Sequence, residues 1–435
     1  MEIQTINGCL NLNLDMVQTL SLGAIMYYCG VFIRNKIPIF TKLSIPASAL
    51  GGLIIAVLLS FLQYIDLAII RFDPTLENLL MLTFFATVGM NASYKLLLNG
   101  GLLIIAFWGI CSFTILVQNF LGISIAKLFG MNSLMGIICG SVSMMGGLAT
   151  AGSYGKSFAL DFGVTEAIPA GFACATFGMI IGSALGGLLA EWIIKIRKIK
   201  TPYAETIKKN KSDTGDQSSD YEEIGVLAQE EGVVAVDSEE EDVISGPHLM
   251  KNLAWILVAL GCGTVLSHYF STIKIGRWVA IFPSYLYTMI IAVIVRNIGD
   301  STELFKIDTK AVGMISDISL AIFVTTAIMS LHLGHIMNLA LPILIILSSQ
   351  IILILIISYF MVFWLLGKDY DSTVMSAGLV GFGLGATPNA LANMKTVTSK
   401  HGVAIKALFV VPIVSAFLVD LTNAMLISIL ANIFN

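Results

Sequence analysis

The stretch Gly381-Phe-Gly-Leu-Gly-Ala-Thr-Pro388 interrupts a long uncharged run near the end of the chain. It belongs to the run 372–394, which holds four glycines and one proline, and a second uncharged run, 129–155, holds seven glycines. Gly and Pro both destabilise helix interiors, so neither run predicts a straight helix. Irregular backbone is tolerated at membrane depth only where it is buried in protein or lines a cavity. Both runs therefore predict broken, re-entrant hairpins.

The sequence around these two runs has the composition of an integral membrane protein. Of its 435 residues, 57% are hydrophobic and 12% are charged, whereas a soluble domain carries about 25% charged residues. The runs 101–126 and 340–367 contain no charge and exceed the ~20 residues that cross a bilayer core. The predicted spans are 16–33, 43–64, 78–94, 101–126, 167–190, 252–272, 278–295, 311–334, 340–367 and 407–431.

The positions of Lys and Arg predict the orientation of these spans. If both Gly-rich runs are re-entrant, 19 of the 24 Lys and Arg residues lie on one side, whereas the split is 14 to 10 if both runs cross. The positive-inside rule favours the first arrangement. We therefore expect a multi-pass protein of the plasma or inner membrane with both termini outside. The acidic segment 201–250 is expected to be a flexible cytoplasmic linker.

This linker separates two halves, 1–200 and 251–435, that resemble each other. The matching pairs, displaced by 237 to 239 positions, are 84–90 with 323–329, 146–150 with 383–387, and Pro46 with Pro283. Five spans in each half force the second half to enter the membrane the opposite way round. The predicted fold is thus all-α, with about ten helices in two inverted five-helix repeats and one Gly-rich hairpin in each. This plan is typical of secondary transporters.

The tips of the two hairpins are the predicted substrate site. Glycine lets backbone approach a ligand closely, N–H groups at a helix start can bind a carboxylate, and uncapped carbonyls can coordinate Na⁺. Close packing of helices through small residues is the alternative explanation of these glycines. The candidate substrate-binding residues are Ser143, Gly146, Gly147, Thr150, Gly383, Gly385, Ala386, Thr387, Pro388 and Asn389.

Polar residues inside the spans and the second run are the predicted ion ligands. Asp420 is the only acid in the last span, and Asn423 lies on the same helical face. Ionisable groups within a membrane are costly and usually functional, although Asp420 could instead anchor one helix to another. The hydroxyl groups of threonines could simply bond to their own helix. The candidate ion ligands are Thr87, Thr176, Thr326, Asn393, Asp420 and Asn423.

No other chemistry is indicated by the sequence. Gly155-Lys156-Ser157 imitates the end of a phosphate-binding loop, but Thr150 stands where that motif requires its first glycine. The spans contain no pair of residues suited to intramembrane catalysis. We expect no enzymatic activity, no cofactor, no transition metal and no nucleic-acid partner.

Residues 381–388 and the sequence around them resemble the glutamate:sodium symporter family. The resemblance continues in the second half through Ala390, Ala392-Asn393-Met394, 410–412, 417–420 and Asn423-Ala424, and in the first half through Ile45-Pro46, Gly51-Gly52, Met81-Leu82, 84–87, 134–136, Gly140-Ser141 and 173–178. It implies ten spans, two re-entrant loops and a homodimer. It also implies uptake of glutamate, or a related amino-acid or dicarboxylate anion, driven by Na⁺ through alternating access.

The first hairpin departs from the pattern of that family. Members usually read Gly-Gly-His-Gly-Thr there, whereas this chain has Leu148 and Ala149 in place of His and Gly. If this loop reads the amino group or the distal carboxylate, the substrate differs from glutamate. A proton-coupled carrier of another organic anion and a channel remain as alternatives.

Overall fold

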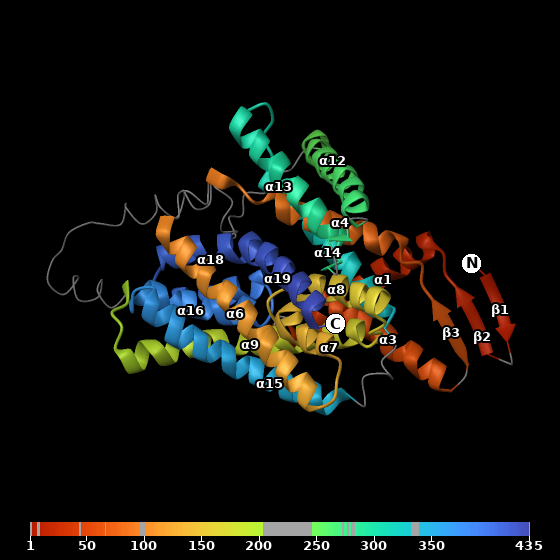
Figure 1. The fold of residues 1–435 in the computed structure, drawn as a ribbon, viewed down its shortest axis with the longest axis horizontal. Coiled ribbons are helices and arrows are strands. Elements are labelled where there is room, and N and C mark those ends of the chain that lie inside the picture. Colours follow the sequence, from red (N-terminus) through yellow and green to blue (C-terminus); the bar gives the residue numbers. More distant parts are fainter. Residues whose placement is uncertain are drawn as a thin grey trace.

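The computed structural model is a bundle of helices with two small groups of strands (Figure 1). It describes residues 2–6, 9–42, 45–65, 67–95, 101–202, 246–271, 274–275, 278–279, 283–331 and 339–434. Most of the expected linker, 203–245, lies outside this part. Within it, eight helices are long and apolar enough to cross a membrane. The prediction of a helical, multi-pass membrane protein is confirmed.

Helices occur at all ten predicted spans. In the first half they are α1 (Met16–Lys36) with the short α2 (Pro38–Lys42), α3 (Ala47–Tyr64), α4 (Thr75–Met90), α6 (Gly101–Leu128) and α9 (Ala167–Arg197). In the second half they are α12 (Gly246–Ser271), α13 (Ser284–Thr302), α14 (Thr309–Met329), α15 (Ala340–Ile357) with the π-helical η3 (Ser358–Phe363), and α18 (Ile405–Ile413), η4 (Val414–Leu418) and α19 (Val419–Phe434).

Two helix starts differ most from the prediction. Helix α13 begins at Ser284 rather than at residue 278, because Pro283 stands as its N-cap with an extended ψ of 145°. Helix α12 begins at Gly246, inside the segment expected to be linker. In both places the predicted span begins where the uncharged run begins. The uncharged run follows the expected lipid boundary, and the helix starts at a different residue.

Each Gly-rich run forms helices on either side of a break. The first Gly-rich segment consists of α7 (Ser133–Ile137), the π-helical η1 (Ile138–Val142) and α8 (Gly147–Phe162), and the second consists of α16 (Tyr370–Gly383) and α17 (Thr387–His401). The breaks thus fall at 145–146 and 384–386. Gly140 has a non-helical ψ of −131° within η1. The expectation that neither run is a straight helix is met.

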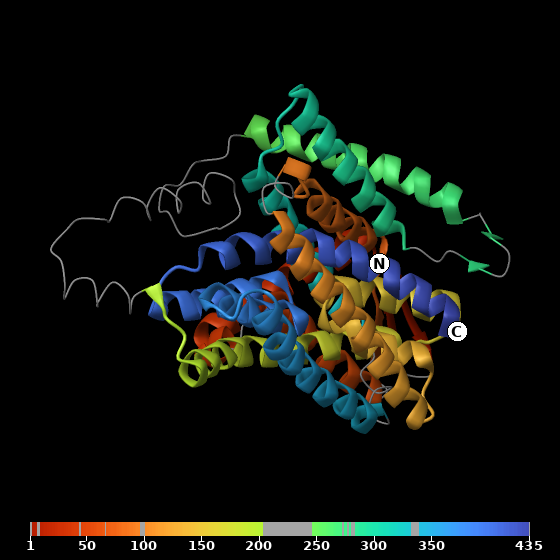
Figure 2. The ribbon, with the colours of Figure 1, turned by 60° about the vertical axis from the view of Figure 1, so that its left-hand side comes forward.

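The helices pack in two groups. The first group contains α1, α3 and α4 from one half with α12, α13 and α14 from the other, and α12 and α13 lie together along one side in Figure 2. The second group contains α6, α9, α15, α18, α19 and both Gly-rich segments. Small residues permit close packing, since a Cβ atom at Gly122 of α6 would lie 2.1 Å from the carbonyl oxygen of Gly136 in α7.

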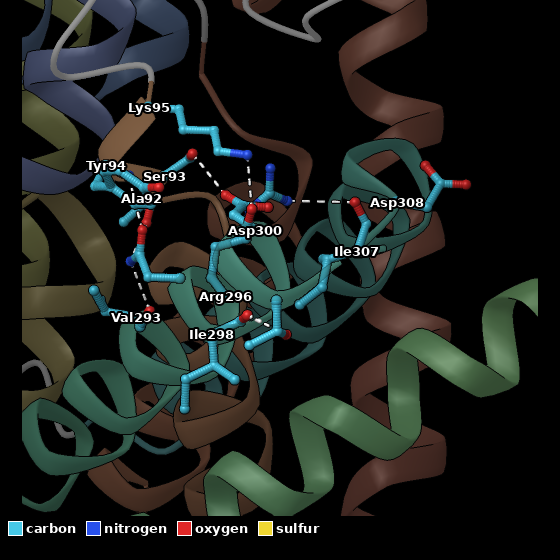
Figure 3. A network of polar contacts seen from close by, with 12 residues as sticks. Ala92, Ser93, Tyr94, Lys95, Val293, Arg296, Ile298, Asp300, Ile307 and Asp308 are labelled. Carbon is cyan, nitrogen blue, oxygen red and sulfur yellow. Dashed lines mark hydrogen bonds and ion pairs between the residues drawn. The ribbon is translucent and has the colours of Figure 1, made fainter. Parts of the chain in front are cut away.

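A polar network joins members of the first group at one end (Figure 3). Asp300, near the end of α13, accepts hydrogen bonds at Oδ2 from Ser93 Oγ (2.7 Å) and from Arg296 Nε (3.0 Å). Its backbone oxygen accepts a hydrogen bond from Lys95 Nζ (2.7 Å). The chain that follows α4 is thereby fastened to α13.

Short strands that the sequence analysis did not predict lie at the N-terminal edge of Figure 1. Strand β1 (Glu2–Ile6) pairs antiparallel with β2 (Cys9–Asn13), which pairs in parallel with β3 (Ala68–Arg71). A second pair, β4 (Lys274–Ile275) and β5 (Trp278–Val279), is antiparallel. Residues 278–279, predicted to begin the seventh span, are therefore strand.

Candidate functional site

The breaks of the two Gly-rich segments meet each other. Gly147 has a φ of +63°, and a Cβ atom at this position would lie 2.8 Å from the carbonyl oxygen of Gly385 and 3.8 Å from Ala386 Cβ. Helices α8 and α17 begin at Gly147 and Thr387, so two helix N-termini lie at this meeting point. The first N–H groups of a helix have no intrahelical partner and carry partial positive charge. Such an arrangement can bind carboxylate groups.

Of the other predicted substrate residues around the first break, Ser143 and Thr150 are buried and Gly146 is partly exposed. The side chain of Thr150 packs over Gly146, where a Cβ atom would lie 2.4 Å from Thr150 Cβ. Ser143 Oγ donates a hydrogen bond to the carbonyl oxygen of Gly171 in α9 (3.0 Å). Leu148, in the first turn of α8, is only 7% exposed. The side chains of Ser143, Leu148 and Thr150 thus pack against protein in this structure.

The second break is fastened to α9 by two amides of α17. Asn389 Nδ2 donates to the carbonyl oxygen of Met179 (3.0 Å) and to Ser183 Oγ (2.9 Å). Asn393 Nδ2 donates to the carbonyl oxygen of Gly182 (2.9 Å). Pro388 lies in the first turn of α17, where a missing N–H costs no helix bond. Asn393, a predicted ion ligand, therefore uses its nitrogen to hold α17 on α9.

The first break is held by a second predicted ion ligand. Ser141 Oγ donates to Asn423 Oδ1 (2.6 Å), and Asn423 Nδ2 donates to the Ser141 carbonyl oxygen (3.1 Å). Asn119 Nδ2 of α6 donates to Ser141 Oγ (2.8 Å). All three residues are buried. Asn423 thus links α19 to the bend at Gly140, and Asn119 completes the contact.

A chain of buried amides runs from α15 to the second break. Gln350 Nε2 donates to the backbone oxygen of Gln118 (2.8 Å), and Gln118 Nε2 donates to the carbonyl oxygen of Gly383 (3.0 Å). We call Gln118, Asn119, Ser141, Gln350, Gly383 and Asn423 the polar belt. The sequence analysis missed Gln118, Asn119 and Gln350. The sequence does contain a signal for these three residues, because they are amide side chains within the uncharged runs 101–126 and 340–367.

The three predicted threonine ligands each donate a hydrogen bond to their own helix. Thr87 Oγ1 bonds to the carbonyl oxygen of Phe84 (2.6 Å), Thr176 Oγ1 to that of Phe172 (2.8 Å), and Thr326 Oγ1 to that of Ile322 (2.9 Å). Thr326 lies against α1, since a Cβ atom at Gly23 would be 2.6 Å from its methyl group. Their hydroxyl hydrogens are thus used locally, and Thr326 faces a helix of the first group.

Asp420 lies where the two groups of helices meet. It is partly exposed in the first turn of α19, directly after η4, and it interacts electrostatically with Tyr285 of α13. Tyr154 of α8 packs edge-on against Tyr285 and donates a hydrogen bond to the Ala424 carbonyl oxygen (2.6 Å). No hydrogen bond to the Asp420 carboxylate comes from the residues that the structure describes.

A cavity of about 280 Å³ separates the same two groups. Its walls include Glu77 of α4 and Ala327 of α14 on one side, and Gly152 and Lys156 of α8 on the other. Lys156 Nζ forms an ion pair with Glu77 Oε1 (2.7 Å) across it. The cavity therefore borders the limb of the first Gly-rich segment that starts at Gly147.

Comparison with known proteins agrees with this architecture. A sequence model of the family described as Sodium/glutamate symporter matches residues 12–403. The Sodium/glutamate symporter of Haemophilus influenzae is 32% identical over 412 residues, which cover 95% of this chain and 96% of the relative. The protein of the same name from Escherichia coli K12 is 31% identical over 417 residues, which cover 96% and 97% of the two chains. The chain therefore belongs to the sodium/glutamate symporter family, a family of membrane transporters and not of enzymes.

Proposed function

We propose that this protein uses the inward movement of Na⁺ to take up glutamate, or a closely related amino-acid or dicarboxylate anion. The observation that carries the proposal is the meeting of the two breaks at Gly147 and Gly385. The N-termini of α8 and α17 lie there, and a substrate with two carboxylates can use both. The relatives named as sodium/glutamate symporters support the choice of ion and substrate.

The fold that we propose is a pair of inverted five-span repeats with re-entrant Gly-rich segments. The packing supports this, because contacts between the halves occur in exchanged pairs: α3 packs on α14 as α4 packs on α13. Helix α9 contacts the second Gly-rich segment, and α19 contacts the first. The matched prolines Pro46 and Pro283 are the N-caps of α3 and α13. A two-fold relation between repeats produces such exchanged contacts.

Alternating access would move the two groups of helices relative to each other. The cavity and the Glu77–Lys156 ion pair lie between these groups. In the orientation expected from the charges, this cavity opens toward the outside. We therefore propose that it is part of the path by which the substrate reaches Gly147.

The proposed orientation has both termini outside and the linker in the cytoplasm. Single cysteines at positions 215 and 240 of a Cys-less variant should react with impermeant reagents only from the cytoplasm, and one at position 131 only from outside. Reaction of all three from one side would refute this orientation. We also propose a homodimer, as the family resemblance implies, which native mass spectrometry of the purified protein would test.

Uptake by the purified protein in proteoliposomes tests the function. Radiolabelled glutamate should accumulate when an inward Na⁺ gradient is imposed and should saturate with concentration. Vesicles with K⁺ on both sides serve as the control for leakage. Uptake driven by a proton gradient without Na⁺ would indicate a proton-coupled carrier, and flux that never saturates would indicate a channel. Competition by a panel of amino acids and dicarboxylates would then rank the substrates.

A further inference from the structure

Two amide oxygens of the polar belt are buried without a partner. The side chains of Gln118 and Gln350 are fully buried, and their Oε1 atoms have no hydrogen-bond partner among the residues that the structure describes. Leaving a buried polar atom without a hydrogen-bond partner is costly. Two such atoms, on residues joined by a hydrogen bond, therefore indicate an occupant.

The amide nitrogens fix which way these oxygens can be used. Gln118 Nε2 is held by the carbonyl oxygen of Gly383, and Gln350 Nε2 by the backbone oxygen of Gln118. Turning either amide round would place oxygen against oxygen, so each Oε1 atom is the group left for a ligand. Both groups are acceptors, and a cation or a hydrogen-bond donor would satisfy them.

The surrounding backbone favours a cation. Gly383 is the last residue of α16, and the last carbonyl groups of a helix lack intrahelical partners and carry partial negative charge. The Gln118 backbone oxygen also lies beside the first segment, since a Cβ atom at Gly140 would be 3.1 Å from it. Carbonyl oxygens of broken helices and helix C-terminal ends are the groups that coordinate Na⁺ in transporters of this architecture.

We propose that Gln118 and Gln350 bind one of the transported Na⁺ ions through their Oε1 atoms, next to the C-terminal end of α16. This inference rests on the proposed Na⁺ coupling and adds ligands that the analysis of the sequence did not name. Gln118 and Asn119 are neighbours on α6 and contact different Gly-rich segments. An ion bound to Gln118 therefore contacts α6, the helix whose side chains bond to both Gly-rich segments. Binding of Na⁺ would thereby stabilise the arrangement in which the two breaks meet.

The test is Na⁺-dependent thermal stabilisation of the purified protein without glutamate, followed by uptake. Gln350→Met and Gln118→Met replace the amide by an apolar group of similar length. Each should raise the Na⁺ concentration for half-maximal stabilisation at least ten-fold. Gln350→Glu keeps an oxygen in the place of Oε1 but puts a second oxygen against the Gln118 backbone oxygen, so it should lower the melting temperature and still keep the Na⁺-dependent stabilisation. If the Gln350 amide has only a structural role, Gln350→Glu and Gln350→Met should lower the melting temperature equally, and neither should change the Na⁺ midpoint.

Asn252→Leu is the matched control. Asn252 is a buried amide of α12 whose Nδ2 and Oδ1 both have partners, the His248 carbonyl oxygen and the Asp308 amide. Its replacement should lower the melting temperature and leave the Na⁺ midpoint unchanged. Unchanged midpoints in both methionine variants would overturn the proposal and assign the two oxygens to buried water. A wild type without Na⁺-driven uptake would instead refute the proposed function itself.

Discussion

Replacement of Gly147 by alanine should strongly slow transport without unfolding the protein. The residue has a φ of +63°, a conformation that costs an L-residue about 1–2 kcal/mol. The added Cβ atom would also lie 2.8 Å from the Gly385 carbonyl oxygen. This neighbour is backbone, so one of the two breaks must move. The conformational strain alone lowers the population of the state in which the breaks meet by about 5- to 30-fold.

Initial rates of glutamate uptake in proteoliposomes measure this effect, with the melting temperature recorded in parallel. Gly109→Ala is the control, because a Cβ atom at Gly109 of α6 meets no atom within 4 Å. Alanine there should stabilise the helix by about 0.5–1 kcal/mol and preserve uptake. Wild-type kinetics of Gly147→Ala would show that the close approach of the breaks is unimportant for transport, and the reasoning above would fail.

Three further variants test other parts of the site. Asp420→Asn, at the boundary between the groups, should weaken the Na⁺ dependence of uptake far more than it lowers expression; an unchanged Na⁺ titration would exclude Asp420 as a ligand. Leu148→His combined with Ala149→Gly should shift preference toward glutamate by about ten- to a hundred-fold, and an unchanged ranking in a competition panel would show that these side chains do not select the substrate. Asn423→Ala should cost about 1–3 kcal/mol by removing both buried hydrogen bonds between Asn423 and Ser141, and an unaltered melting temperature would contradict that role.

The sequence predicted the helices well because their signal is local. Each uncharged run gave a helix, and the glycines of 129–155 and 372–394 gave the breaks. Boundaries were less accurate, because loss of charge marks lipid contact rather than the end of a helix. Helix α13, for example, starts only after Pro283.

The polar belt could not be predicted, because its contacts join distant parts of the chain. Gln118 and Gln350 are 232 positions apart in sequence, and neither is surrounded by a motif. Only the packing of α15 on α6 brings them together. The sequence analysis selected Asp420 and Asn423 because they are polar residues within a span. Polarity alone could not predict that Asn423 Oδ1 accepts a hydrogen bond from Ser141 Oγ.

The pairing of β2 with β3 has a consequence for how the chain is made. Strand β2 precedes α1, whereas β3 follows α3, so these two helices must return the chain to its starting side before the strands can meet. The ribosome has synthesised Arg71, the partner of Asn13, only after both helices. The sheet can therefore form only when α1 and α3 have both inserted correctly. A chain whose α3 failed to insert would leave β2 and β3 on opposite faces of the bilayer, where they could not pair.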